Sequence, residues 1–167
     1  MHGCIDGMPM KHSVALTTQS DLTESGAEAL RERSSRPVVL IIYDDATARL
    51  ALAAMISPDE FELVFATDAA DARSRMALID PDLIICDLVM KEMCVDELFR
   101  WLQADARWSL VPVICVTLLD NQVVRTDLLR SGADAVLVKP CNGAELRAQV
   151  QVALRTRWKY LRLALRE

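Results

Sequence analysis

The fold is decided by one stretch of the sequence, which reads Val38-Val39-Leu40-Ile41-Ile42-Tyr43-Asp44-Asp45. Its first six residues form an unbroken apolar run with β-branched side chains, as expected of a strand that is buried on both faces. Two acids follow directly, at the point where that strand would end. A strand buried on both faces predicts a parallel sheet with helices above and below it.

The rest of the chain alternates between helical and strand-like patterns, so that each occurs five times. After the first strand, the spacing of apolar residues predicts a helix over Thr47–Ser57, which stops at Pro58. The other predicted strands are Phe61–Ala66, Leu83–Cys86, Val111–Val116 and Ala135–Val138, and the other predicted helices are Asp68–Ile79, Asp96–Ala104, Asp120–Arg130 and one from Gly143 onward. Five such units predict an α/β fold with a doubly wound, five-stranded parallel sheet and an extended C-terminal helix.

Composition and charge indicate one soluble globular domain. The chain has 167 residues, of which 52% are hydrophobic and 26% charged, and no apolar run reaches the ~18–20 residues that span a bilayer. Residues 37–142 hold 17 acidic and nine basic residues, a net charge of −8, whereas residues 143–167 hold six basic and two acidic residues, a net charge of +4. An acidic body disfavours nucleic acid as a partner and favours metal ions or basic protein surfaces.

The patterns divide the chain into three parts. Residues 1–36 are predicted to be a poorly ordered N-terminal extension, in which a short helix around Glu24–Arg33 is compatible with the sequence. Residues 37–154 form the predicted domain, and residues 155–167 extend its last helix. The five cysteines are odd in number and lack a Cys-x-x-Cys pair, so we expect buried thiols in a reducing cytoplasm.

Polar residues with related chemistry follow four of the predicted strands. The first strand ends in Asp44 and Asp45, the third in Asp87, the fourth in Thr117 and the fifth in Lys139. Such sheets carry their working site beyond the carboxyl ends of the strands. Three carboxylates there would repel each other without a cation, and hard oxygen ligands suit Mg²⁺. A hydroxyl and an ammonium group suit phosphate oxygens, so the sequence predicts an aspartate that accepts a phosphoryl group.

Four motifs carry a resemblance to a known family: Asp44-Asp45, Asp87-Leu88-Val89-Met90, Val116-Thr117 and Val138-Lys139-Pro140. From about Pro37 to Leu154 the sequence resembles the receiver domain of bacterial two-component response regulators. The resemblance implies a flavodoxin-like fold and phosphorylation of Asp87 by a histidine kinase or phosphotransfer protein.

The same resemblance assigns roles to the other residues of the predicted site. It implies that Asp44, Asp45, Asp87 and the backbone carbonyl of Val89 bind Mg²⁺. It also implies that Thr117 and Lys139 bind the phosphoryl oxygens, and that the Lys139–Pro140 peptide bond is cis.

The acidic pair departs from the family pattern in its register. Without a gap, Tyr43 and Asp44 fall on the pair, and Asp45 comes one position later; a shift by one restores two acids but misplaces the apolar face of the next helix. We favour the ungapped register, in which Asp44 binds the metal directly and Tyr43 replaces the acid that usually acts through water. Magnesium binding is then weakened but not abolished.

Other departures are Lys91 and Val95 in the loop after the phosphoacceptor, Leu118 after the threonine, and Val136 in place of the usual switching aromatic. Leu118 is expected to crowd the path of the phosphoryl group, and Val136 argues against a threonine–aromatic switch. Val89 and Leu119 are apolar and cannot orient an attacking water, which predicts a long-lived phosphoryl-aspartate.

The last helix carries one apolar stripe formed by Leu146, Val150, Leu154, Trp158, Leu161 and Leu165. Its length of about 34 Å exceeds what the sheet needs, and the excess, Arg155–Glu167, is basic and apolar. This end could be solvated, pair with a second copy as a homodimer, or dock on an acidic partner; contact with a membrane or DNA is disfavoured.

The leading prediction is a stand-alone receiver that signals through contacts with a downstream protein and catalyses only its own Mg²⁺-dependent phosphorylation and dephosphorylation. The alternative is a degenerate receiver that serves as a phosphorylation-independent interaction or scaffold module. An aspartate-nucleophile phosphohydrolase is disfavoured, because Val89 stands where such an enzyme needs a second acid.

Overall fold

The computed structural model describes residues 36–56, 58–87 and 95–164, and all structural statements concern these residues. Residues 1–35 of the predicted N-terminal extension, the predicted ligand Val89 and the loop residue Lys91 lie outside them.

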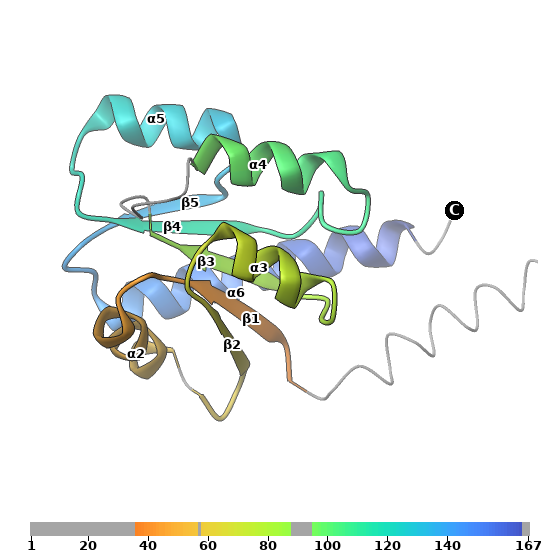
Figure 1. Ribbon diagram of the computed structural model, residues 1–167, viewed down its shortest axis with the longest axis horizontal. Helices are drawn as coiled ribbons and strands as arrows, with labels where there is room; N and C mark the ends of the chain where they lie inside the picture. Colours follow the sequence, from red (N-terminus) through yellow and green to blue (C-terminus); the bar gives the residue numbers. More distant parts are fainter. Residues whose placement is uncertain (1–35, 57, 88–94, 165–167) are drawn as a thin grey trace, which may run out of the picture.

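The core of the molecule is a five-stranded, fully parallel sheet with the order β2-β1-β3-β4-β5 (Figure 1). The strands are β1 (Val38–Ile42), β2 (Glu62–Ala66), β3 (Leu83–Cys86), β4 (Val113–Thr117) and β5 (Ala135–Val138), and the helices are α2 (Ala46–Met55), α3 (Ala69–Met76), α4 (Val95–Ala104), α5 (Gln122–Ser131) and α6 (Gly143–Ala164). The predicted doubly wound, flavodoxin-like fold with a long last helix is confirmed.

Alternate residues of the strands face two separate apolar layers. Leu40 and Ile42 of β1 pack on the side of α3, α4 and α5, whereas Val39 and Ile41 pack on the side of α2 and α6 (Figure 1). Because helices cover both faces of the sheet, the strands are continuous apolar runs and do not alternate between apolar and polar residues. None of the helices in the described ranges is both long and apolar enough to cross a membrane.

Short polar side chains fix the helix ends. Asp68 caps α3, because its side chain accepts a hydrogen bond from the amide of Asp71. α5 begins later than predicted, since Asn121 rather than Asp120 is its N-cap. Gly132 ends α5 with a φ of +129°, a conformation that favours glycine, and a Cβ atom there would lie 2.8 Å from Nε2 of Gln103.

The course of α6 differs from its predicted stripe. Leu146, Val150 and Leu154 are buried, but the next buried position is Arg157, which is 5% exposed, while Trp158 is 44% exposed. Arg157 belongs to the segment Arg155–Glu167, which the sequence describes as basic and apolar. Its Nε lies 3.6 Å from Oδ1 of the buried Asp82, so a charge pair extends the buried face where the apolar stripe turns away.

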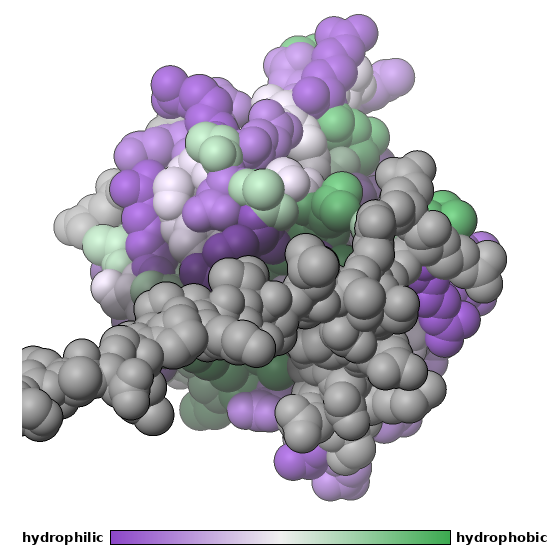
Figure 2. All heavy atoms as spheres, turned by 90° about the vertical axis from the view of Figure 1, so that its right-hand side faces the viewer, coloured by the Kyte–Doolittle hydropathy of each residue, from purple (hydrophilic) through white to green (hydrophobic). Residues whose placement is uncertain are grey.

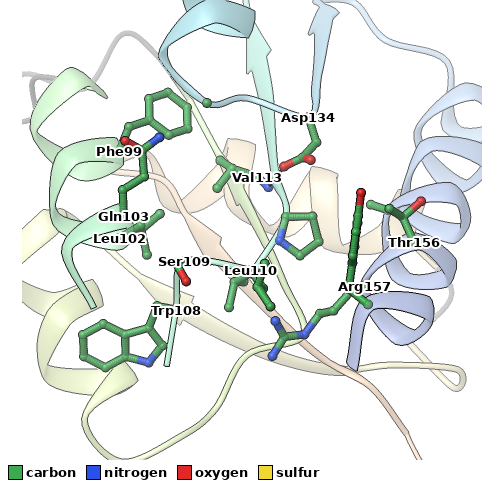
Figure 3. A pocket seen from close by; sticks show the side chains of 15 residues that line it. Phe99, Leu102, Gln103, Trp108, Ser109, Leu110, Val113, Asp134, Thr156 and Arg157 are labelled. Carbon is green, nitrogen blue, oxygen red and sulfur yellow. Dashed lines mark hydrogen bonds between the residues drawn. The ribbon is translucent and has the colours of Figure 1, made fainter. Parts of the chain in front are cut away.

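Arg157 also borders a cavity of about 160 Å³ at the N-terminal ends of β4 and β5. Figure 3 shows its side chain reaching from α6 below Leu110, with Asp134 and Trp108 on other sides of the cavity. Asp134 accepts a hydrogen bond of 2.8 Å from the amide of Val113. The cavity therefore lies at the edge of the sheet opposite to the predicted site.

The cysteines in the described ranges are free. Cys86 and Cys115 are buried on neighbouring strands with their sulfurs 3.7 Å apart, and Cys141 is partly buried. The contact with Cys115, together with burial, raises the pKa of Cys86 well above its ordinary value. The expected buried thiols are confirmed for this pair.

Candidate functional site

Four strands end at the same edge of the sheet and bring the predicted residues together there. Pairing of Ile42 with Cys86 and of Cys86 with Cys115 aligns β1, β3 and β4, and Thr117 pairs with Val138 of β5. This is the left-hand edge of the sheet in Figure 1, where the strand arrows end. Thr117 is the last residue of β4, and Asp87 and Lys139 directly follow β3 and β5.

The phosphoacceptor candidate, Asp87, is held by a cation. It is 8% exposed, and Nζ of Lys139 donates a hydrogen bond to its Oδ2. The amide of Asp87 donates to the carbonyl of Ile42 over 3.4 Å. A carboxylate removed this far from water needs a charged partner, and Lys139 provides it from a strand two places away in the sheet.

Thr117 and Lys139 are fixed to each other through the backbone. The amide of Lys139 donates to the carbonyl of Thr117 over 2.7 Å, and the Lys139–Pro140 peptide bond is cis, as the resemblance implies. Thr117 is fully buried, and its hydroxyl oxygen accepts a hydrogen bond of 3.1 Å from the amide of Leu119. Its hydroxyl hydrogen is left to donate to a further acceptor.

Tyr43 has a role in the site that the sequence did not reveal. It is 1% exposed, its hydroxyl donates to the carbonyl of Val116 over 3.3 Å, and Nζ of Lys139 lies 4.7 Å from the centre of its ring. Burial raises the pKa of Tyr43 far above its ordinary value, and the charge of Asp87 adds to this. The ring is therefore a neutral surface beside the Lys139 ammonium.

The acidic pair lies in the turn between β1 and α2. Asp45 is the N-cap of α2, and its Oδ1 accepts a hydrogen bond of 2.6 Å from the amide of Ala48. Arg49 of the same helix donates to the carbonyl of Tyr43 over 2.8 Å. Asp44 and Asp45 are both exposed after the end of β1.

The donor set suits Mg²⁺ with two protein carboxylates. In the ranges that the structure describes, no group of three or more His, Cys, Asp or Glu side chains is arranged to hold a metal ion. Asp44 and Asp87 follow neighbouring, paired strands, and Mg²⁺ commonly uses one or two carboxylates and keeps several waters. The residues present fit this ion, and Asp45 also caps α2.

Two of the departures from the family pattern have defined places. Leu118 is 66% exposed, so its side chain is directed mainly to solvent. Val136 is buried in the apolar layer beneath α3, α4 and α5, and this position holds no aromatic ring.

Comparisons with known proteins agree with this geometry. A family model described as the response regulator receiver domain matches residues 39–151. The sensory transduction protein RegX3 of Mycobacterium tuberculosis is 31% identical over 117 residues, which make up 70% of this chain and 50% of that protein. The sensor histidine kinase TmoS of Ectopseudomonas mendocina is 32% identical over 126 residues, or 75% of this chain and 13% of that one. The chain thus spans half or less of these curated relatives.

Solved structures show the same fold. The signal receiver domain of a signal transduction histidine kinase from Syntrophus aciditrophicus is 29% identical with a TM-score of 0.65, covering 72% of this chain and 91% of that one. The signal receiver domain of a LuxO repressor protein from Vibrio parahaemolyticus has a TM-score of 0.69 at 22% identity, covering 75% and 95%. The chain therefore belongs to the response regulator receiver domain family of two-component phosphorelay signalling.

Proposed function

We propose that the chain accepts a phosphoryl group on the carboxylate of Asp87 from a phosphohistidine of a histidine kinase or phosphotransfer protein. The observation that carries this proposal is the contact between Asp87 and Lys139 at the carboxyl edge of the sheet. It places a nucleophilic oxygen and a cation side by side, where Thr117 also ends its strand. Phosphoryl transfer depends mainly on such positioning and charge stabilisation.

In the proposed step, an oxygen of Asp87 attacks the phosphorus of the donor's phosphohistidine. An oxygen–phosphorus bond forms as the phosphorus–nitrogen bond breaks, and its electron pair returns to the imidazole, which takes up a proton. Lys139 moves from Asp87 to a phosphoryl oxygen, and the Thr117 hydroxyl donates to another. Both contacts stabilise the negative charge that the group brings.

Magnesium has a defined place in this proposal. When bound by Asp44 and Asp87, it supplies positive charge against the incoming phosphoryl group. The carbonyl of Val89 is proposed as a further ligand from the family resemblance. Asp45 is assigned to the helix cap that its contact with Ala48 supports.

The partners follow from the family. Receiver domains are not enzymes in the ordinary sense, and we propose that this one catalyses only Mg²⁺-dependent phosphorylation and dephosphorylation of its own Asp87. Its output would pass to a downstream protein in the cytoplasm, without nucleic acid or membrane. The stand-alone arrangement, with an extension over 1–36, a receiver over 37–154 and a helix extension over 155–167, stays a proposal, as does a homodimer through α6. The relatives above match over part of longer chains.

A second candidate is a degenerate receiver that works as a scaffold without phosphorylation. One observation favours it: Tyr43 fills a position that the family gives to an acid, so a neutral ring lies near Lys139 in addition to the carboxylate of Asp87. This lowers the negative charge available to a cation.

Phosphorylation with acetyl phosphate and Mg²⁺ separates the candidates. Intact mass measurement should show one added phosphoryl group on the wild type and none on Asp87→Asn. Absence of the group from both proteins would support the scaffold instead. Continuous release of phosphate from small esters would indicate a phosphohydrolase.

A further inference from the structure

A groove lies along the second half of α6, beside the segments that lead into β1 and β2. Its volume is about 470 Å³. Its apolar lining comes from Pro37, Phe61, Leu154 and Trp158, and Trp158 is 44% exposed although it is among the largest apolar side chains of the molecule. Figure 2 views the side on which α6 ends, where hydrophobic (green) patches lie among hydrophilic (purple) side chains.

The rim of this groove is cationic. Arg155, Lys159 and Arg162 line it from successive turns of α6 and are all exposed, and Glu60 is its single acid. An apolar lining with three cations fits a segment that has acids on one face and apolar side chains beside them.

Residues 21–32 of this chain have that pattern. Asp21, Glu24, Glu28 and Glu32 are spaced by three, four and four residues, which in a helix places all four carboxylates on one face. Two apolar side chains of this segment, Leu22 and Ala29, fall on an adjacent face of the same helix, whereas Leu30 falls on the opposite face. The segment therefore complements the groove in both charge and apolar surface.

The position of this segment in the chain favours binding within one molecule. Only residues 33–36 separate it from Pro37, which itself lines the groove, and four residues span at most about 14 Å. A tether this short gives an effective concentration on the order of millimolar. A second copy at micromolar concentration would compete poorly.

We propose that residues 21–32 dock in this groove, with their carboxylates on Arg155, Lys159 and Arg162 and with Leu22 and Ala29 on Trp158 and Phe61. The groove lies beside the segments that lead into the first two strands, whereas Asp87 follows the carboxyl end of β3. Docking thus leaves the phosphoacceptor open and covers a surface that would otherwise be offered to another acidic partner.

Carbodiimide cross-linking of the full chain, followed by peptide mass spectrometry, tests the proposal. It should join Lys159 to a carboxylate of residues 21–32. In an equal mixture of ¹⁴N- and ¹⁵N-labelled chains, each linked pair should carry a single isotope. Pairs of mixed isotope would show binding of a second copy, and absence of the link would exclude the segment; either result overturns the proposal.

Charge reversal supplies the matched control. The Arg155→Glu/Arg162→Glu variant keeps Lys159 reactive, but its link to residues 21–32 should fall by about fivefold or more, and adding Glu24→Arg/Glu28→Arg should restore it to the remaining acids. An undiminished yield in the first variant would contradict docking by charge. Asp87→Asn should leave the link unchanged, so that a failure of docking and a failure of phosphorylation are separately visible.

Discussion

Tyr43 shows how one residue changes the chemistry of a receiver site while the fold stays the same. Its backbone continues β1 into the site, its ring contacts the Lys139 ammonium, and its hydroxyl donates to the carbonyl of Val116. A carboxylate at this position would add charge for a metal. The tyrosine instead adds an apolar, neutral surface beneath the lysine.

The two functions of the Tyr43 side chain are separable by substitution. Tyr43→Phe keeps the ring beneath Lys139 but removes the hydrogen bond to Val116, so it should lower the free energy of unfolding by about 1 kcal/mol and preserve the rate of phosphorylation by acetyl phosphate. Tyr43→Leu should slow that rate as well, because Lys139 loses the ring. Urea unfolding and intact mass kinetics measure both effects. Equal rates for the two variants would argue against a positioning role.

Tyr43 also predicts how the free energy of unfolding changes at alkaline pH. Because the pKa of Tyr43 is raised in the folded state, only the unfolded chain ionises this tyrosine above its ordinary pKa of about 10. Unfolding then releases a proton, and the wild type loses up to about 1.4 kcal/mol per pH unit relative to Tyr43→Phe. Unfolding curves should show the wild type as the more stable protein at pH 8 and the phenylalanine variant as the more stable one near pH 11. A constant difference between the two would contradict the burial of a neutral hydroxyl.

The neighbouring acids should behave differently from each other. Asp44→Ala should weaken Mg²⁺ binding by about tenfold or more with little change in stability, since a direct ligand is lost. Asp45→Ala should cost about 1 kcal/mol of stability, because α2 loses its cap, and should leave Mg²⁺ affinity nearly unchanged. Calorimetric titration with Mg²⁺ and urea unfolding would check this. Loss of Mg²⁺ affinity in Asp45→Ala but not in Asp44→Ala would instead support the register shifted by one residue.

Leu119 affects the expected lifetime of the phosphoryl group on Asp87. Leu119 is half-exposed and cannot orient a water for attack on the phosphorus, so we expect a long-lived phosphoryl-aspartate. Leu119→Gln should shorten the half-life, since an amide side chain can hold that water. Loss of the added mass after removal of acetyl phosphate gives the rate. A wild-type half-life of seconds would contradict the expectation.

At the scale of elements, α6 is joined to the first strand by a buried charge pair. Arg157 lies 3.6 Å from one oxygen of Asp82, whose other oxygen accepts a hydrogen bond of 3.0 Å from the amide of Val38. Arg157→Ala leaves Asp82 buried without this cation and should lower the free energy of unfolding by about 3 kcal/mol. Arg155→Ala, an exposed neighbour on the same helix, should change it by under about 0.5 kcal/mol. Similar costs for the two variants would show that the buried pair adds nothing.

Local patterns predicted the elements well because each carries its own signal. The bounds of β3 and β5 agree with the predicted runs Leu83–Cys86 and Ala135–Val138, and Asp68 and Gly132 mark helix ends by side-chain chemistry that acts over a few residues. Contacts between distant parts of the chain carry no such signal. The pairs Arg157–Asp82 and Tyr43–Lys139 depend on how the sheet brings together residues far apart in the sequence.

The sequence predicts which residues gather at the candidate site but does not predict the contacts that each of them makes. Parallel strands end at one edge, so Asp87, Thr117 and Lys139 could be assigned to one place from their positions after apolar runs. Whether Asp45 is a ligand or a cap depends on where α2 begins, and the sequence leaves that start uncertain by a residue. The hydrogen bond from Ala48 shows that Asp45 caps α2, and the choice of Asp44 as the direct ligand stays a proposal.

At the scale of the whole molecule, the uneven charge has two separate meanings. Part of the negative charge of residues 37–142 is gathered at the carboxyl edge, where Asp44 and Asp87 suit a cation. The positive charge of the last helix is exposed beside the groove at Trp158, beside the segments that precede β1 and β2. Phosphorylation and docking would therefore act on separate surfaces.

The central claim is that Asp87 receives the phosphoryl group. The most direct measurement is peptide mapping of the acetyl phosphate-treated full chain, after reduction of the acyl phosphate with borohydride, which converts the modified aspartate to homoserine. The account predicts homoserine at position 87 alone, formed only when Mg²⁺ is present. Homoserine at Asp44 or Asp45, or an unmodified Asp87 in a protein that is fully folded, would contradict it.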